Sequence, residues 1–466
     1  MEQQFKLTAK YLAILRDKII SGEEAFVREQ LKELHSVDIA AILNKIEPSE
    51  AKYLYNLLEE DEVSKVLVEM EEEGREKLLA SLSSKEIAER FIDNMSSDDA
   101  ADVISELSDK QQGEVLSHVE DAGQASNIAD LLKYDENTAG GLMAKELVRV
   151  NIAWNVLECV RQMRRQAEHM ESVYAVYAVD NDDKLMGILP LQKLLTTPVR
   201  SKILDVIEPN VISVKTNVSG EEVAQLMDKF DLVVLPVVDH LGRLVGKITI
   251  DDVVDFIRKE QTEDIQKIGG MEAIDTPYMN TSFTEMIKKR SPWLVVLLIG
   301  ESFTATAMSF FEDQISKAVV LALFVPLIIS SGGNTGSQAS TLIVRALALN
   351  EISLSEWWRI MRKELRVGLF LGVILGIVGF LRVAVWSVFV NVYGPNWLPV
   401  ALTIGFSLVG VVLWGNLIGS LLPIFLKKIN LDPAVSSAPF VATLVDVTGL
   451  VIYFTVASFF LRGILL

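Results

Sequence analysis

The stretch Pro439-Phe-Val-Ala-Thr-Leu-Val-Asp-Val-Thr-Gly449 places one acidic residue, Asp446, inside an apolar run of about residues 434–461. The run is long enough to cross a membrane, because a spanning helix needs about 20 mostly apolar residues. A charge at the centre of a bilayer costs from about 3 kcal/mol upward. Asp446 is therefore either a structural aspartate, protonated or paired with Arg345 or Arg382, or a carboxylate of a pore or substrate site. We favour the second interpretation.

Four further apolar stretches precede this run, at about residues 292–311, 318–349, 367–390 and 398–426. Each is long enough for one spanning helix, so the sequence predicts five spans. Basic residues occupy alternate connections, namely before the first span, between the second and third, and between the fourth and fifth. Positive charge stays on the cytoplasmic side of a membrane. The N-terminal half is therefore expected in the cytoplasm, and the C-terminus on the far side.

Polar residues inside the spans are the candidates for function. The second span contains Pro326 and the run Ser330-Ser-Gly-Gly-Asn-Thr-Gly-Ser-Gln338, which are expected to interrupt it. Such backbone is tolerated in a membrane only where protein buries it or where it lines water. Its small residues fit close helix packing equally well. Glu301 of the first span and Asn416 of the fourth are each consistent with a functional or a structural role.

Charge divides the chain at about residue 284. Residues 284–466 hold 13 Lys and Arg against 9 Asp and Glu, so the formal charge of −19 leaves −23 on residues 1–283. An acidic soluble half argues against nucleic-acid binding and suits cations. The chain has one cysteine, Cys159, and four histidines without metal-ligand spacing. No phosphate-binding glycine loop precedes a helix, so we do not expect an enzyme. The first residues lack the pattern of a secretory signal.

The first 134 residues repeat a short helical unit. Hydroxyl or acidic residues begin short apolar helices at intervals of about twelve residues or twice that, and Val37–Leu43 resembles Lys85–Phe91. One short helix cannot bury its own apolar face, so the pattern predicts a small α-solenoid of stacked pairs. Most acidic residues here are expected to cap helices.

A second repeat covers about residues 140–260. Val176–Pro190 matches Leu235–Thr249, and Asp180 and Asp239 occupy equivalent places 59 residues apart. Each copy has an amphipathic helix, a β-run, a turn with an aspartate, a second β-run and a helix. This pattern resembles tandem CBS domains. Such pairs often bind adenine nucleotides, which makes ATP a candidate ligand.

Acidic residues crowd the end of this repeat, at Asp251, Asp252, Asp255, Glu260, Glu263 and Asp264. Like charges three or four residues apart repel on a helix. These residues therefore do not stabilise the helix unless a cation or a basic partner lies among them. The alternative is a solvated helix face, on which the nearby Arg258 and Lys259 are the partners of these acidic residues. Residues 265–290 are expected to continue one long amphipathic helix to the first span.

The whole arrangement resembles the MgtE magnesium channels along nearly all of the chain. The motifs that carry the resemblance are Pro326 with Gly332–Gln338, Leu431-Asp-Pro-Ala434, and Pro439–Gly449. The expected architecture is an acidic all-α superhelical N domain (1–134), α/β tandem CBS domains (135–262), a connecting helix (263–290) and a five-helix transmembrane domain (291–466). The resemblance implies a homodimer with its ion path on the twofold axis.

The resemblance also implies roles for particular residues. Asp446 and its symmetry mate would hold a largely hydrated Mg²⁺, with the backbone carbonyl of Ala442 nearby and Asn334, Gly333 and Thr335 along the path. Mg²⁺ gives up water reluctantly, which suits carboxylates that act through water. Regulatory Mg²⁺ sites are implied at acidic residues of the soluble half and the membrane face: Asp98, Asp102, Glu221, Asp231, Asp252, Asp255, Glu260, Glu263, Asp264 and Asp432.

The expected function is Mg²⁺ uptake across the cell (inner) membrane by a channel that cytosolic Mg²⁺ closes. Neither an obligate protein partner nor nucleic acid is expected. Two alternatives stay open, namely a cation-coupled carrier or exchanger for divalent metals that uses the same aspartate, and a membrane sensor that transports nothing.

Overall fold

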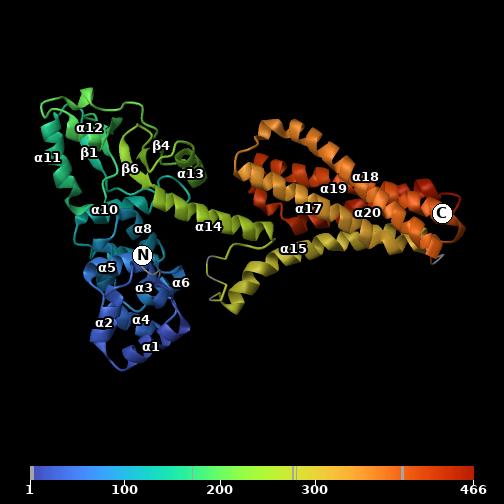
Figure 1. Cartoon of the computed structure of the whole chain (residues 1–466), viewed down its shortest axis with the longest axis horizontal. Helices are drawn as coiled ribbons and strands as arrows, with labels where there is room; N and C mark the ends of the chain where they lie inside the picture. The colour runs from blue at the N-terminus through green and yellow to red at the C-terminus, as the bar shows by residue number, and fades with distance from the viewer. Residues whose placement is uncertain are drawn as a thin grey trace. The chain divides into compact units, whose positions relative to one another are not determined.

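The computed structural model describes residues 5–170, 172–274, 276, 278–279, 281–389 and 393–465. The chain divides into two compact units, Met1–Lys259 and Glu260–Leu466 (Figure 1). The first unit holds short helices and two small sheets, and the second holds long apolar helices. The predicted fold class is therefore confirmed.

The N-terminal part of the first unit consists of ten short helices. They are α1 Ala9–Ile20, α2 Glu24–Lys32, α3 Ser36–Leu43, α4 Pro48–Tyr55, α5 Glu60–Val68, α6 Glu72–Leu79, α7 Ser84–Arg90, α8 Ser97–Ser105, α9 Asp109–Leu116 and α10 Ala122–Leu131. Hydroxyl residues begin several of them: the Ser83 hydroxyl accepts from the Glu86 amide at 3.3 Å, and the Glu86 carboxylate accepts from the Ser83 amide at 2.8 Å. This reciprocal cap satisfies two amides that a helix start leaves unpaired.

Two three-stranded sheets follow, built to the same plan. The first contains β1 Val148–Asn151, β2 Val176–Val179 and β3 Leu185–Leu189, with helices α11 Val156–Gln166 and α12 Leu191–Thr196. The second contains β4 Val214–Lys215, β5 Val234–Val238 and β6 Leu244–Thr249, with helix α13 Gly220–Lys229. In each sheet the first strand is parallel to the second and the second antiparallel to the third.

The repeated aspartates form the turns of these sheets. Asp180 Oδ1 accepts from the amides of Asp182 and Lys184 at 2.8 and 3.0 Å. Asp239 Oδ1 accepts from the amides of Leu241 and Arg243, both at 2.9 Å. The carboxylates therefore replace backbone partners in equivalent turns, which explains why the motif occurs twice.

One hydrophobic core joins the helical part to the second sheet module. Buried side chains of the helices, such as Ile104 and Ile128, belong to the same cluster as Val223 and Ile248 of the second module. The first module has a separate core around Val150 and Cys159. The helical part and the second module are thus packed as a single body.

The connection to the membrane helices differs from the single long helix that the sequence suggested. Helix α14 covers Ile250–Ile268, and Gly270 then adopts a φ of 77°. A new helix, α15 Phe283–Phe310, begins at a cap in which Ser282 Oγ accepts from the Glu285 amide at 3.2 Å. The prediction was wrong because the pair Gly269-Gly270 ends the helix in the left-handed region that glycine adopts without strain.

In the part of the second unit that the structure describes, five helices are long and apolar enough to cross a membrane: α15, α17 Val325–Ala348, α18 Trp357–Phe389, α19 Trp397–Lys428 and α20 Ala438–Leu461. A short helix, α16 Glu312–Lys317, follows α15. Helix α17 continues without a break through Ser330–Gln338, and Pro326 lies in its first turn. The expected interruption of this span is therefore wrong, because proline is tolerated in a first turn and protein buries the glycines.

Glycines bring the long helices together. A β-carbon on Gly336 of α17 would lie 2.9 Å from the Gly415 carbonyl oxygen of α19, and one on Gly376 of α18 would lie 2.7 Å from the Gly405 carbonyl oxygen. Such close backbone contact replaces the hydrophobic driving force that membrane helices lack.

Candidate functional site

Helix α17 has two faces of opposite character. Gly332, Gly333 and Gly336 are buried among the neighbouring helices, whereas the polar residues Ser330, Asn334 and Gln338 are exposed at intervals of four residues. These three residues form a polar stripe along one side of the helix. A polar stripe is unfavourable against lipid, so water or a second protein surface must cover it.

Asp446 lies beside this stripe, on α20. A β-carbon on Gly333 would lie 3.3 Å from Cβ of Ala442 and 3.7 Å from Oδ1 of Asp446. The absence of a side chain at Gly333 thus lets α17 approach the carboxylate closely. Three of the predicted pore residues are together at this point, and Asn334 follows directly on the exposed face.

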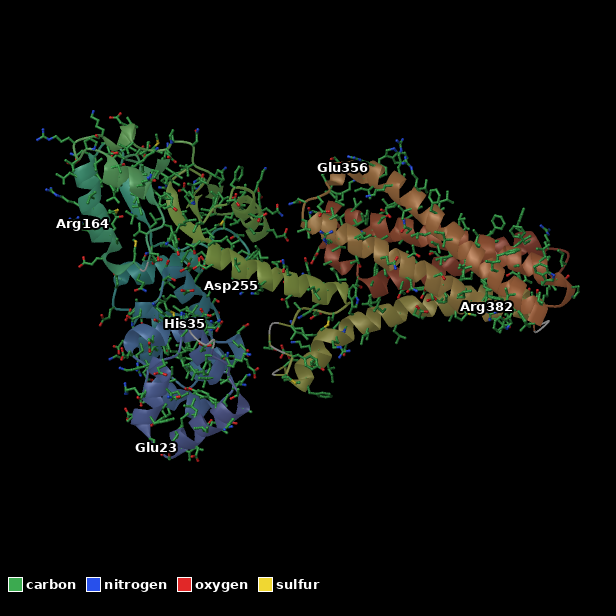
Figure 2. The ribbon with its side chains drawn as sticks, viewed as in Figure 1. Glu23, His35, Arg164, Asp255, Glu356 and Arg382 are labelled. Carbon is green, nitrogen blue, oxygen red and sulfur yellow. The ribbon has the colours of Figure 1, made fainter. Side chains whose placement is uncertain are left out.

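No side chain in the described ranges donates a hydrogen bond to Asp446 or forms an ion pair with it. Arg345 instead lies 3.4 Å from Glu351. Arg382, towards the end of α18 (Figure 2), stacks over Trp386 at 3.7 Å from the ring centre. Neither arginine therefore pairs with Asp446, although the sequence allowed either pairing. Glu301 of α15 interacts electrostatically with Asp446, which adds a second acidic group near it.

Two other polar residues of the spans have local partners. Thr335 is buried, and its hydroxyl donates to the Ser331 carbonyl at 2.8 Å. Asn416 is buried on α19, and its amide donates to the backbone and side-chain oxygens of Glu364 on α18 at 2.8 and 2.9 Å. Asn416 therefore has a structural role, and the Thr335 hydroxyl faces its own helix rather than the polar stripe.

A second group of acidic residues lies in the soluble unit, where the helical part meets the second sheet module. Asp98, Asp99 and Asp102 belong to α8, and Asp251 and Asp252 belong to the first turn of α14. Glu136 and Glu146, from the segment between the two parts, also act electrostatically on α8. We call these seven carboxylates the α8–α14 acidic cluster.

Burial and the crowding of like charges raise the pKa values in this cluster. Burial, and then the charge of Asp98, raises the pKa of Asp99 to about 7, and the same two causes raise the pKa of Asp252 to about 7. They also raise the pKa of Asp102 to about 7, although this side chain remains accessible to solvent. The pKa of Asp98 itself is raised by burial and by Glu146. A divalent cation would favour the ionised forms of all four.

Hydrogen bonds fix most of these carboxylates. Ser96 Oγ donates to Asp99 at 2.7 Å, Ser97 Oγ donates to Glu146 at 2.9 Å, and Thr249 Oγ1 donates to Asp252 at 2.5 Å. Oδ1 of Asp98 is the exception, because it is buried without a hydrogen-bond partner. An unpaired buried acceptor is costly, so this atom fits a cation or an ordered water.

The described part of the chain contains no group of three or more His, Cys, Asp or Glu side chains set as a metal cage. The cluster is a set of neighbouring carboxylates that act on one another electrostatically. Mg²⁺ is commonly held through one or two carboxylates with several retained waters, so the donor set fits this ion.

The remaining predicted acidic residues lie elsewhere. Glu221 and Asp231 are exposed on the second module, and Asp255 is exposed on α14 (Figure 2), 3.5 Å from Arg258. Glu260, Glu263 and Asp264 follow on α14. In the membrane unit, the Lys267 ammonium lies 2.6 Å from Glu263 and 2.7 Å from Asp432. A lysine thus joins two acidic residues for which the family resemblance implies a role in binding Mg²⁺.

Sequence reasoning missed Asp99, Glu136 and Glu146 as members of the cluster, and Lys267 as a bridge; Asp251 was noted among the crowded acidic residues but not among the regulatory sites. Asp99 and Asp251 adjoin predicted acidic residues, so their neighbourhood was a usable signal. Nothing in the local sequence marks Glu136 or Glu146, because only the tertiary fold brings them to α8.

These features define a polytopic membrane protein with an acidic soluble part and a carboxylate beside a polar stripe in its spans. Family profiles match in the same order: the MgtE intracellular N domain at residues 34–137, CBS domains at 139–199 and 203–259, and MgtE, divalent cation transporter, at 325–456. The magnesium transporter MgtE of Thermus thermophilus is 41% identical over 342 residues, which are 73% of each chain.

Two further known proteins are similar to this chain. The magnesium transporter MgtE of Enterococcus faecalis is 34% identical over 73% of this chain and 72% of that protein. The crystal structure of the cytosolic domain of the Mg²⁺ channel MgtE in complex with ATP is 32% identical, with a TM-score of 0.49, over 53% of this chain and 99% of that one. The chain belongs to the MgtE family of magnesium transporters, which are not enzymes, and it is a multi-pass membrane protein with an intracellular N domain.

Proposed function

We propose that the chain is a homodimeric Mg²⁺ channel of the cell (inner) membrane, which admits Mg²⁺ and closes when cytosolic Mg²⁺ is high. The observation that carries this proposal is the polar stripe of α17 beside an Asp446 that has no partner in the described chain. Protein that exposes polar side chains within a membrane needs water or another subunit against them. A water-filled path between two copies of the chain supplies both the water and the second subunit.

In this path, Asp446 and its symmetry mate hold Mg²⁺ through its waters. Two carboxylates neutralise the ion, and retained waters keep it weakly enough bound to leave, as conduction requires. Asn334 faces the path, Gly333 lets α17 approach Asp446, and the Ala442 carbonyl is one turn away. Thr335 supports the helix from its buried side.

Closure follows from the acidic cluster between α8 and α14. When cytosolic Mg²⁺ is high, ions among these carboxylates offset their repulsion and favour the compact form of the soluble unit. A ligand shifts such a balance by its differential affinity for the two forms, and several weak sites together supply the several kcal/mol of a decisive switch. Glu221, Asp231, Asp255, Glu260, Asp264, Glu263 and Asp432 are further candidate sites. ATP at the CBS pair is a second candidate effector, by likeness to relatives.

The test is Mg²⁺ flux into proteoliposomes that contain the parent or Asp446→Asn, with both shown to be folded and dimeric. We expect rapid flux for the parent at low internal Mg²⁺, and at least about a hundredfold less, or unselective flux, for the variant, because the ion loses its paired charge. Glu356→Gln removes one carboxylate outside the polar stripe and should leave flux unchanged.

Other outcomes select the alternatives. Saturable flux that depends on a counter-ion would favour a cation-coupled carrier that uses the same aspartate. No parent flux at low internal Mg²⁺ would favour a sensor, and equal flux in parent and Asp446→Asn would move the ion site elsewhere.

A further inference from the structure

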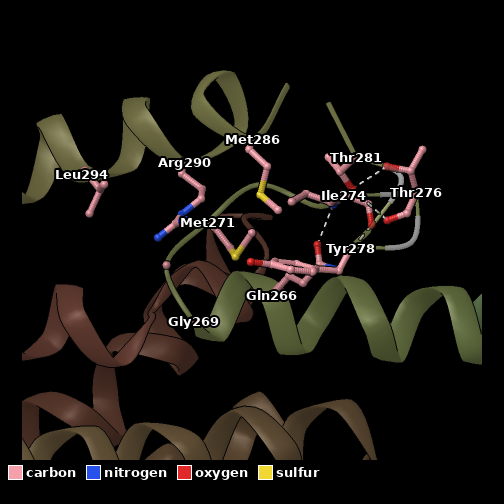
Figure 3. A pocket seen from close by; sticks show the side chains of 11 residues that line it. Gln266, Gly269, Met271, Ile274, Thr276, Tyr278, Thr281, Met286, Arg290 and Leu294 are labelled. Atoms are coloured by element: carbon pink, nitrogen blue, oxygen red, sulfur yellow. Dashed lines mark hydrogen bonds between the residues drawn. The ribbon is translucent and has the colours of Figure 1, made fainter. Parts of the chain in front are cut away.

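A pocket of about 430 Å³ lies in the membrane unit, at the start of the first spanning helix (Figure 3). Its walls are the end of α14, the segment after it and the first turns of α15. Figure 3 shows Arg290, Met286 and Met271 turned into the space between α15 and α14. Ile274 and Leu294 add further apolar lining, so the pocket combines an apolar wall with one cation.

Hydrogen bonds hold the pocket walls. The side-chain amide of Gln266 pairs with Ile274 in both directions, accepting from its amide at 2.6 Å and donating to its carbonyl at 3.3 Å. The Glu272 amide donates to the Lys289 carbonyl of α15 at 3.1 Å. These bonds fasten the segment to both helices, so the pocket is a formed site.

One polar group in the pocket and one buried behind its wall have no partner in the described chain. The Arg290 guanidinium forms no ion pair there, and Nε1 of Trp293 is a buried donor without an acceptor, next to Gly270 of the pocket wall. Both groups are donors. Arginine matches phosphate geometry in particular, because its fork of N–H groups binds two oxygens at once.

The surroundings of the pocket are those of a membrane interface. Phe283, Ile287, Arg290 and Leu294 share one face of α15, and the three apolar members are exposed. Lys288 and Lys289 adjoin Arg290. In the most apolar stretch of α15, only 6% of the residues are buried within the chain, so the helix leaves most of its apolar surface open. Basic residues at the cytoplasmic end of a span attract anionic lipids, and exposed apolar side chains enter the bilayer.

We propose that this pocket binds an anionic phospholipid of the cytoplasmic leaflet, with its phosphate on Arg290 and the start of one acyl chain against Met271, Met286 and Leu294. A soluble anion would use the charge but leave the apolar wall and the exposed stripe of α15 in water. The lipid covers both, and its phosphate oxygens are acceptors for the Arg290 guanidinium.

The test uses the full-length protein in bilayer nanodiscs of equal phosphatidylglycerol and phosphatidylcholine, followed by native mass spectrometry of the retained lipid. For Arg290→Ala we expect retained phosphatidylglycerol to fall about tenfold relative to phosphatidylcholine, as for a lost hydrogen-bonded ion pair. Arg359→Ala removes an exposed arginine from the first turn of α18 and should change the ratio by less than about twofold.

A second measurement locates the lipid. Phosphatidylglycerol with a photoreactive acyl chain should label the peptides around Met271 and Met286, and Met286→Trp, which fills the pocket and keeps Arg290, should abolish that labelling. The proposal is overturned if Arg290→Ala and Arg359→Ala have equal effects, if inorganic phosphate displaces the lipid, or if the pocket residues cross-link to a second copy of the chain instead. Mg²⁺ flux is not a readout here, so the outcome is independent of the channel proposal.

Discussion

At the scale of single residues, Asp98 is the charged group that three other aspartates of the α8–α14 acidic cluster share as a neighbour, and its effect on their pKa values comes second only to burial. Its charge is among the main causes that raise the pKa values of Asp99, Asp102 and Asp252 to about 7. The unfolded chain has no such crowding, and an ordinary aspartate has a pKa of about 3.8. Between these values the folded form therefore holds more protons than the unfolded form, so the free energy of unfolding falls as pH rises.

We expect residues 1–259, a compact unit with its own core, to lose about 2 kcal/mol of unfolding free energy between about pH 5 and pH 8 without divalent cations. Added Mg²⁺ should restore most of this loss at pH 8, because the ion binds the ionised cluster. Urea unfolding at several pH values, with EDTA or Mg²⁺, measures both effects. Asp98→Asn should flatten the pH dependence and weaken the Mg²⁺ effect. A free energy that stays level or rises over this range in EDTA contradicts the prediction.

At the scale of elements, a lysine joins the end of α14 to the turn before α20. Lys267 contacts Glu263 of α14 and Asp432 at the 3-10 turn Pro433–Val435, and these two carboxylates raise the pKa of its ammonium group. Lys267 thus holds the two elements together in the absence of metal. Without the ammonium group of Lys267, the carboxylates of Glu263 and Asp432 would repel each other.

Lys267→Met should loosen this connection and make it dependent on Mg²⁺. We expect faster amide hydrogen exchange at the end of α14 in EDTA, by about fivefold to tenfold, which corresponds to the loss of a pair of partly screened ion pairs. Mg²⁺ should restore the protection, because the freed carboxylates can bind it. Lys259→Met removes an exposed lysine of the same helix and serves as the control. Equal exchange in both variants, with or without Mg²⁺, would mean that Lys267 does not hold the two elements.

Elements that follow local patterns could be predicted from the sequence, whereas those that depend on tertiary contacts could not. The five spans and the doubled sheet modules agree with hydropathy and with the repeat of Asp180 at Asp239. The single helix expected over 265–290 was wrong, because Gly269-Gly270 ends α14 although the amphipathic periodicity continues beyond it. Helix α17 keeps its polar run helical because its glycines are buried against α19 and α20.

The candidate sites also divide into features that a local sequence pattern predicts and features that depend on tertiary contacts. A lone aspartate in an apolar run is visible in a sequence, so Asp446 could be selected, but its isolation from Arg345 and Arg382 required the fold. The meeting of Asp98 with Asp252, about 150 residues later, depends on a core that joins the helical part to the second module. No local pattern encodes such a meeting.

At the scale of the whole molecule, the membrane unit alone leaves its polar stripe uncovered. Ser330, Asn334 and Gln338 are exposed on α17, and five helices of one chain provide nothing in the described ranges that covers them. Lipid cannot satisfy these side chains. A second copy related by a twofold axis would place two such stripes face to face, with water and ions between them.

This arrangement makes a cross-linking prediction that does not depend on transport. With Cys159→Ala as background, Asn334→Cys should form a dimer with a short bifunctional thiol reagent, because the two stripes face each other across the axis. Ile374→Cys, exposed on α18, should react as a monomer and stay monomeric, because its face meets lipid. Electrophoresis under denaturing conditions separates the two products. Equal cross-linking at both positions, or at neither, would place the polar stripe away from a twofold axis. Asp446 would then face water within a single chain, and the paired-carboxylate pore would lose its basis.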